Sequence, residues 1–252
     1  MAEPAPERVA IVTGAAGGIG SAVVALLLAR GYAVVAEDIS RKVRQFATSH
    51  PGKVIAMQAD VTDSEAARGA VGLATGTFGR LDPLVNNAGL FLRKPTEDCT
   101  DEDFDVLMAT NVRGAFSHSR EALPALEKTS GSIVNLASIS GLVGMPGQTV
   151  YAMTKGAIVQ LTRQLAVEHA HRGIRVNAVA PGAVDTDFVA NARDAAADPD
   201  PAASRATAIS QHPIGRILTP AEIAEAIVFL ASPAARAITG AILPVDGGYV
   251  AR

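Results

Sequence analysis

Tyr151, Lys155 and Ser138 are the residues whose types and spacing could carry out proton chemistry. Tyr151 and Lys155 are four positions apart, which places both side chains on the same side of a helix. A free tyrosine has a pKa of about 10 and is a poor base at neutral pH, but a nearby ammonium group lowers that pKa. Ser138 follows the apolar run Ser132–Leu136, so we expect its hydroxyl at the end of a strand. The three residues indicate proton transfer at an alcohol or carbonyl oxygen, although the Tyr–Lys spacing alone is more typical of an exposed helical pair.

A glycine-rich turn lies near the start of the chain. The first apolar run leads into Thr13-Gly14-Ala15-Ala16-Gly17-Gly18-Ile19-Gly20 and then directly into a helical pattern. Glycines in such a turn let backbone N–H groups approach a pyrophosphate, whose charge a helix N-terminus favours. The spacing is G-x-x-x-G-x-G rather than the commoner G-x-G-x-x-G, and a tight strand-to-helix connection could need the same glycines. The position between the first strand and the first helix favours a dinucleotide cofactor.

Glu37 and Asp38 follow the second apolar run. An acid about twenty residues beyond the glycines can accept the ribose hydroxyls of NAD and repel the 2′-phosphate of NADP. No Arg or Lys lies inside the glycine turn to neutralise such a phosphate. Asp38 could instead cap the next helix, as Ser40 could equally well, and Arg41 and Lys42 are near enough to weaken the discrimination. We expect NAD as the cofactor, with NADP less favoured.

Short apolar runs alternate with amphipathic stretches along the whole chain. The runs are apolar on both faces, as expected for strands buried between helical layers. This alternation predicts a single doubly wound (Rossmann-type) α/β fold, a parallel sheet with helices on both faces. The predicted strands are Arg8–Thr13, Tyr32–Ala36, Val54–Gln58, Leu84–Val85, Ser132–Leu136, Arg175–Val179 and Ala241–Pro244. The predicted helices are Gly18–Arg30, Asp63–Thr75, Asp103–Leu126, Tyr151–His171 and Pro220–Ala231.

No charged or Ser/Gly-rich linker divides the chain, so residues 1–252 are predicted to form one dinucleotide-binding domain. The exception to the regular alternation is 187–213, which is rich in Ala, Asp and Pro. Connections this long are uncommon without a function. A lid over a site at the strand ends is therefore favoured over a plain surface insertion.

The composition excludes several classes of protein. With 48% hydrophobic and 19% charged residues, the chain can bury a sizeable core and is not a disordered protein. The net charge of −3 and the absence of Trp argue against a nucleic-acid partner. The longest apolar run, Ala22–Ala29, is far short of the about 20 residues that a membrane span needs, and the N-terminus lacks a signal-peptide pattern. His169 and His171 are two positions apart on a predicted helix and point apart, and the other three histidines are scattered, so we expect solvated side chains and no metal site. These features predict a soluble, cytoplasmic protein.

Several motifs in this order resemble those of the short-chain dehydrogenase/reductase family, over nearly the whole chain. They are Thr13-Gly14-x-x-x-Gly18-Ile19-Gly20, Asp60-Val61-Thr62, Asn86-Asn87-Ala88-Gly89, Asn111, Ser138, Tyr151-x-x-x-Lys155, Pro181-Gly182 with Thr186, and Val245-Asp246-Gly247-Gly248. The combination is far more specific than any one motif.

The resemblance implies a role for each catalytic candidate. Tyr151 would be the general acid/base and Ser138 would orient the substrate oxygen. Lys155 would lower the pKa of Tyr151 and hold the nicotinamide ribose, and Asn111 would support a water that links Lys155 to solvent. The cofactor-binding residues expected from the motifs are Gly14, Gly18, Ile19, Gly20, Asp38, Asp60, Val61, Asn87, Ala88, Gly89, Tyr151, Lys155, Pro181, Gly182, Val184 and Thr186, with Asp60 and Val61 beside the adenine.

The leading hypothesis is therefore hydride transfer between NAD(H) and a small-molecule secondary alcohol or ketone. An NADPH-dependent reductase of 3-oxoacyl-type ketones is an alternative. A serine hydrolase would need a G-x-S-x-G elbow, but Leu136 and Ser140 stand where the glycines around Ser138 should be. A catalytically silent dinucleotide sensor is disfavoured by the complete set of catalytic candidates.

Two long helical stretches, Asn111–Leu126 and Tyr151–His171, carry more apolar surface than one packing contact needs. A buried core accounts for this surface, and the resemblance implies a subunit interface as well. We expect a homotetramer built around these helices.

Overall fold

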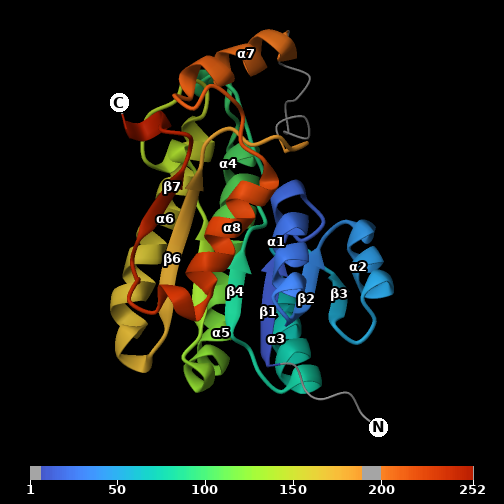
Figure 1. Cartoon of the computed structure of the whole chain (residues 1–252). Coiled ribbons are helices and arrows are strands. Elements are labelled where there is room, and N and C mark those ends of the chain that lie inside the picture. Colours follow the sequence, from blue (N-terminus) through green and yellow to red (C-terminus); the bar gives the residue numbers. More distant parts are fainter. Residues whose placement is uncertain (1–6, 189–199, 252) are drawn as a thin grey trace.

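A single parallel sheet lies between two layers of helices (Figure 1). The computed structural model describes residues 7–188 and 200–251. Its strands are ordered β3-β2-β1-β4-β5-β6-β7, and each neighbouring pair is parallel. This confirms the predicted doubly wound fold. The strands are β1 Arg8–Thr13, β2 Tyr32–Asp38, β3 Val54–Gln58, β4 Pro83–Asn86, β5 Ser132–Leu136, β6 Arg175–Pro181 and β7 Ile242–Val245.

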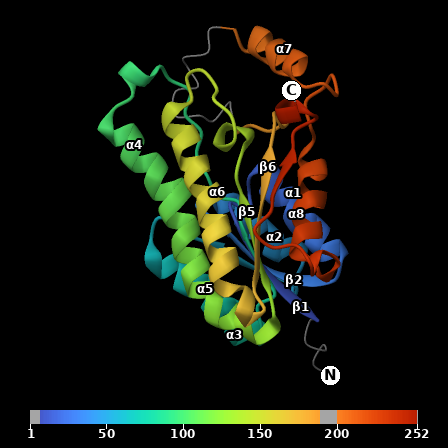
Figure 2. The same cartoon turned by 90° about the vertical axis from the view of Figure 1, so that its left-hand side faces the viewer.

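Alternate residues of the buried strands supply the two hydrophobic cores. On β1, Ala10 and Val12 pack toward α1 Gly18–Ala29 and α8 Pro220–Ala231, whereas Val9 and Ile11 pack toward the other helical layer. Figure 2 shows these layers on opposite sides of the sheet. The second layer consists of α3 Ser64–Phe78, α5 Ala115–Thr129 and α6 Thr149–His169. Within the described ranges, no helix combines the length and apolar character needed to cross a membrane.

The stretch predicted as one helix over 103–126 is divided into three parts. It consists of α4 Asp101–Leu107, a π-helical segment Met108–Gly114 and α5. The π segment contains Asn111, whose side chain bonds to the backbone of Leu90. Such segments accommodate an extra residue per turn and often mark functional sites. The hydrophobic pattern could not reveal the division, because the apolar face continues through it.

Two further helices, α2 Arg44–Ser49 and α7 Pro201–Gln211, were not predicted. α7 begins with Asp200, which accepts a hydrogen bond from the Ala203 N–H, and with Pro201 in the first turn. It occupies much of the segment expected to be a lid. The remainder of that segment includes residues 189–199, which lie outside the described part of the chain.

Two strands extend further than predicted at the carboxyl edge of the sheet. β2 extends to Asp38 and β6 extends to Pro181, each beyond its predicted end. The carboxyl ends of β1, β4, β5 and β6 meet at the same edge, where strand order reverses beside β1. Doubly wound sheets bind their ligands at such a point.

Candidate active site

A cleft of about 1240 Å³ opens at the carboxyl edge of the sheet. The cleft is lined by loops from both sides of the point where the strand order reverses, and by the beginning of α1. Most of the predicted site residues line it: Gly14, Gly18, Ile19, Gly20, Asp38, Asn87, Ala88, Gly89, Ser138, Tyr151, Lys155, Pro181, Gly182, Val184 and Thr186. The structure therefore brings together predicted residues from six separate segments of the chain, but it does not place Asn111, Asp60 or Val61 on the cleft wall.

The glycine turn is held closed by backbone contacts that side chains would prevent. Gly14 has a φ of +63°, a conformation that residues with a Cβ rarely adopt. A Cβ on Gly20 would collide with the carbonyl oxygen of Gly14. The Asn87 amide nitrogen donates to the carbonyl oxygens of Thr13 at 3.0 Å and Gly14 at 2.9 Å. These contacts join the turn to the end of β4 and give it one defined shape.

The N-terminus of α1 lies at the cleft and has no side-chain cap. Gly17 caps it without a side-chain hydrogen bond, and its first turn contains no acidic residue. α6 likewise begins after Gln148 without a side-chain cap, whereas the side chains of Thr100, Asp200 and Thr219 cap α4, α7 and α8. The first N–H groups of α1 are thus available to an anion in the cleft, where the helix dipole favours negative charge.

Asp38 ends β2 beside this turn. Its Oδ2 accepts a hydrogen bond from the Ala16 N–H at 2.9 Å, and its Oδ1 accepts from the Ser40 N–H at 2.8 Å. Ser40 caps the following short turn by accepting from the Lys42 N–H. The carboxylate therefore faces the cleft in a fixed orientation, and the capping role falls to Ser40.

Ser138, Tyr151 and Lys155 come together where β5 ends against α6. Ser138 begins a short turn, Ile139–Gly141, and its hydroxyl hydrogen-bonds to that of Tyr151. A Cβ on Gly141 would lie only 2.7 Å from the Lys155 carbonyl oxygen, so the glycine allows the turn to pack against α6. The Lys155 ammonium donates to the Leu136 carbonyl oxygen at 2.7 Å. All three catalytic candidates are buried or nearly so, and all three line the cleft.

The pKa of Tyr151 differs from the prediction. Burial removes the phenolate from water and raises this pKa well above its usual value, while the hydrogen bond with Ser138 opposes the change in part. The Lys155 ammonium lies 5.6 Å from the centre of the tyrosine ring, and burial lowers its own pKa to about 8. The expected lowering of the Tyr151 pKa is therefore not found in this structure, where burial is the largest influence and the hydrogen bond with Ser138 is what opposes it.

Asn111 lies beneath the cleft wall and contacts two other elements of the site. Its amide nitrogen donates to the Thr154 hydroxyl at 3.0 Å, one residue before Lys155. A Cβ on Gly89 would lie 3.3 Å from Asn111 Oδ1 and 3.7 Å from Lys155 Nζ. Asn111 and Lys155 thus both flank Gly89, and the predicted part of Asn111 in a proton relay stays a prediction.

Asp60 and Val61 lie to one side of the cleft. Asp60 is exposed and accepts a hydrogen bond from the Thr62 N–H, whereas Val61 packs against Gly114. Their contact with an adenine also stays a prediction.

Phe91 was not predicted to line the cleft, whereas Phe188 and His212 belong to the segment 187–213 that was expected to be a lid. The ring of Phe91 packs edge-on against that of Tyr151, with ring centroids 4.9 Å apart, and the ring centroids of Phe91 and Phe188 are 5.9 Å apart. Buried His212 accepts from the Ala183 N–H at 3.0 Å and bonds to the Ala208 carbonyl at 2.6 Å, which ties α7 to the loop after β6. Isolated aromatic residues and histidines give no periodic signal, so only the fold reveals them.

The expectation of solvated histidines is wrong for His118, His169 and His212, which are buried. Nε2 of His118 lies 2.9 Å from Glu37 Oε2, and its Nδ1 lies 2.9 Å from the Gly114 carbonyl oxygen. Burial opposes charge on His118, but these two contacts outweigh it and raise the pKa of the imidazole. Among the described residues, no group of three or more His, Cys, Asp or Glu side chains could hold a metal ion.

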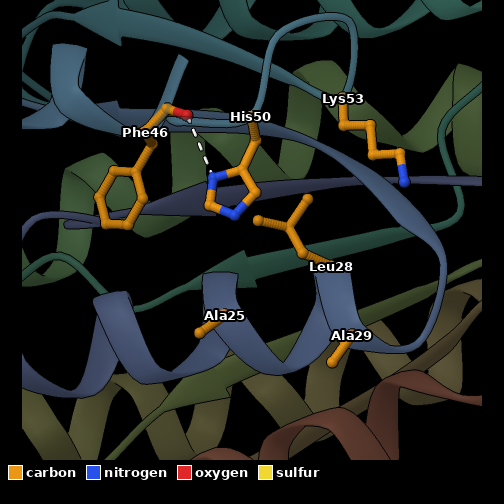
Figure 3. Close-up of a pocket in the computed structure, with 6 residues that line it drawn as sticks. All are labelled: Ala25, Leu28, Ala29, Phe46, His50 and Lys53. Atoms are coloured by element: carbon orange, nitrogen blue, oxygen red, sulfur yellow. Dashed lines mark hydrogen bonds between the residues drawn. The ribbon is translucent and has the colours of Figure 1, made fainter. Parts of the chain in front are cut away.

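A smaller hollow of about 350 Å³ lies between α1 and α2, away from the cleft (Figure 3). His50 is held there by the Phe46 carbonyl oxygen at 3.3 Å, and its neighbours in the hollow are mostly apolar. The residues that line it are Ala25, Leu28, Ala29, Phe46, His50 and Lys53. They do not form a set that could perform the proton chemistry of the larger cleft.

Comparisons with known proteins agree with this geometry. A family model described as "Enoyl-(Acyl carrier protein) reductase" matches residues 14–250. The chain is 42% identical over 260 residues to cis-4-hydroxycyclohexanecarboxylate dehydrogenase of Sinomonas cyclohexanicum, with 100% of both chains covered. It is 38% identical over 248 residues to the 3-oxoacyl-(acyl-carrier-protein) reductase FabG of Thermotoga maritima, with 96% of this chain and 98% of that protein covered.

Solved structures give the same result at the level of the fold. The structure of ElxO with NADP bound matches with a TM-score of 0.87 and 33% identity, covering 97% of this chain and 99% of that one. The likeness thus extends over nearly the whole chain. The chain belongs to the short-chain dehydrogenase/reductase family of oxidoreductases.

Proposed function

We propose that the chain transfers hydride between NAD(H) and a secondary alcohol or its ketone, with Tyr151 as the general acid/base. The observation that carries the proposal is the meeting of Ser138, Tyr151 and Lys155 in the same cleft as the uncapped N-terminus of α1. A relative of this chain is named for the dehydrogenation of a ring alcohol. The chemistry of the cleft suits such a substrate.

The residues divide the reaction between them. The nicotinamide cofactor, when bound, supplies or accepts the hydride. Ser138 holds the substrate oxygen by a hydrogen bond, and Tyr151 donates a proton to that oxygen in reduction or removes it in oxidation. Because burial keeps the tyrosine protonated at neutral pH, the resting site is ready to act as an acid on a ketone. Lys155 is charged below its pKa of about 8 and would hold the nicotinamide ribose.

The proposed cofactor is NAD rather than NADP. The fixed Asp38 carboxylate faces the part of the cleft next to the glycine turn, where it accepts ribose hydroxyls and repels a 2′-phosphate. Arg41 and Lys42, which could weaken this discrimination, are not among the described residues that line the cleft. The alternative, an NADPH-dependent reductase of 3-oxoacyl-type ketones, is kept open by the NADP bound to ElxO and by the name of the Thermotoga relative.

We also propose that the segment 187–213 forms the lid of a single domain and that the protein works as a homotetramer in the cytoplasm. α7 and Phe188 both border the cleft, which supports the lid. Phe116, Met153 and Val167 are exposed on α5 and α6, which supports an interface on these helices. Sedimentation at micromolar concentration tests the assembly, and a monomer there would refute it.

A panel of secondary alcohols with NAD⁺, and of the matching ketones with NADH, tests the activity through the absorbance band of NADH. We expect turnover of at least one pair. If the cofactor binds and no alcohol or ketone reacts, the chain is a dinucleotide sensor instead. A preference for NADPH with 3-oxoacyl thioesters would favour the reductase alternative.

A further inference from the structure

Three cationic side chains border the substrate end of the cleft. Arg93 and Lys94 come from the loop after β4, and Arg205 comes from α7. Asp200 is the acidic residue that lines the same end, and its carboxylate is engaged at the start of α7. This end of the cleft is therefore positively charged, whereas the proposed ribose end carries Asp38.

Two of these cations are paired with carboxylates. Lys94 Nζ lies 3.0 Å from Asp103 Oδ2, and the pKa of Asp103 is lowered to about 2 by the Thr100 N–H and by Lys94. Arg205 Nη1 lies 3.0 Å from Asp185 Oδ1. In the described part of the chain, no ion pair or hydrogen bond engages the guanidinium of Arg93, which is exposed. Arg93 is thus the cation at this end whose charge is available to a ligand.

The backbone of Arg93 is fixed on both sides. Leu92 is buried in the protein, and the Lys94 N–H donates to the Gly147 carbonyl oxygen at 2.7 Å. Gly147 has a φ of +71°, and a Cβ there would lie 3.5 Å from Arg93 Cγ. The stem of the arginine therefore lies against the loop that precedes α6. An anchor whose backbone is already ordered loses little entropy when it binds a ligand.

Arg93 and Phe91 border the cleft, while Leu92 between them points into the core. This alternation is typical of an extended segment, in which residues two apart lie about 6–7 Å from each other on one side. Phe91 is the residue whose ring contacts Tyr151. The segment therefore leads from the proposed acid/base, along an apolar aromatic wall, to an available guanidinium.

We propose that the substrate is a hydroxy acid or keto acid whose carboxylate binds Arg93. The secondary alcohol or ketone would lie at Ser138 and Tyr151, and an apolar ring or short chain along Phe91 would separate it from the acid. A guanidinium suits a carboxylate because it offers parallel N–H donors at the right spacing. This inference rests on the proposed function and adds the chemical class of the substrate.

The test compares a cyclic keto acid, 4-oxocyclohexanecarboxylate, with its uncharged carboxamide, which has nearly the same size. The wild-type enzyme should prefer the acid in kcat/KM. Arg93→Gln should lower kcat/KM for the acid about ten- to hundredfold, as expected for a hydrogen bond between charged groups, and leave the amide within about threefold. The loss should appear mainly in KM, because the anchor contacts substrate and transition state alike.

Two matched variants separate this role from a general loss of positive charge. Arg236→Gln removes an exposed arginine that precedes β7 at the opposite edge of the sheet, and it should leave the ratio of acid to amide unchanged. Arg205→Gln removes a cation already paired with Asp185, so its effect on the ratio should be smaller than that of Arg93→Gln. Arg93→Lys should keep more of the preference for the acid over the amide than Arg93→Gln does.

Equal turnover of acid and amide by the wild type would overturn the proposal, as would an equal loss on both compounds in Arg93→Gln. A selective loss in Arg205→Gln and not in Arg93→Gln would also overturn it. Turnover of uncharged ketones without turnover of the keto acid would overturn the proposal as well. If no ketone reacts, the proposed function fails, and calorimetric binding of the acid to the wild type and to Arg93→Gln still decides whether Arg93 holds a carboxylate.

Discussion

Replacement of Asp38 tests how the site selects its cofactor. Asp38 lines the cleft, and its carboxylate accepts hydrogen bonds from the N–H groups of Ala16 and Ser40, at 2.9 and 2.8 Å. Asp38→Ala removes the charge and both backbone contacts. Asp38→Asn keeps the size of the side chain and one acceptor oxygen, so it isolates the effect of the charge.

The expected magnitude follows from the interactions that are lost. A hydrogen bond to a charged group contributes about 1.5–3 kcal/mol. In the variants, water partly replaces the two hydrogen bonds with the ribose hydroxyls, so the net loss is about 2–3 kcal/mol. This loss corresponds to a roughly 30- to 150-fold lower kcat/KM for NAD. Removing one negative charge from a water-filled site relieves about 1 kcal/mol of electrostatic repulsion for each charge on the 2′-phosphate nearby. The kcat/KM for NADP should therefore increase about tenfold.

The assay is kcat/KM for NAD⁺ and NADP⁺ at a saturating concentration of an alcohol from the panel, together with the Kd of each reduced cofactor from fluorescence titration. The thermal midpoint of each variant shows whether the glycine turn still folds. We expect the wild type to prefer NAD and both variants to narrow or reverse the preference. A clear NADP preference in the wild type, or an unchanged ratio in folded Asp38→Ala, would refute the reasoning.

Four further predictions concern the catalytic groups and the buried pair. Tyr151→Phe should lower turnover about 10²- to 10⁴-fold with NADH binding intact, and near-normal turnover would remove Tyr151 from the mechanism. Because burial raises the pKa of Tyr151, the rate of alcohol oxidation should rise with pH. The KM for the cofactor should increase above about pH 8, because Lys155 loses its charge there. Profiles of rate and KM against pH, measured for oxidation and for reduction, check both statements. Glu37→Ala should lower the free energy of unfolding by about 3–5 kcal/mol, because it leaves His118 buried without its partner, whereas the amide of Glu37→Gln can donate to Nε2 and should cost much less. Since the folded-state pKa of His118 is raised, the stabilisation by the ionic pair is present below about pH 6.5 and is lost as the pH rises through the folded-state value, which urea unfolding at several pH values will show.

The strands and most of the helices could be predicted because their signals are local. β1, β3 and β5 have the predicted bounds, since each is a short apolar run ended by polar or glycine residues. The division of 103–126 could not be predicted, because it depends on the contact of Asn111 with the distant backbone of Leu90. α7 carries a local start signal, Asp200-Pro201, which sequence reasoning overlooked in a region rich in Ala and Pro.

The sequence by itself determined the parallel α/β fold and the order in which the glycine turn, Asp38, Ser138, Tyr151 and Lys155 reach one edge of the sheet. These follow from residue type, from helical spacing and from the rule that the ends of parallel strands meet. Only the tertiary structure decided how those groups ionise and what surrounds them. The raised pKa of Tyr151 comes from burial of a side chain whose ring contacts Phe91, and Glu37 pairs with His118, 81 positions away in the chain. Desolvation and such pairings depend on which segments pack together in space, and no spacing along the chain encodes that directly.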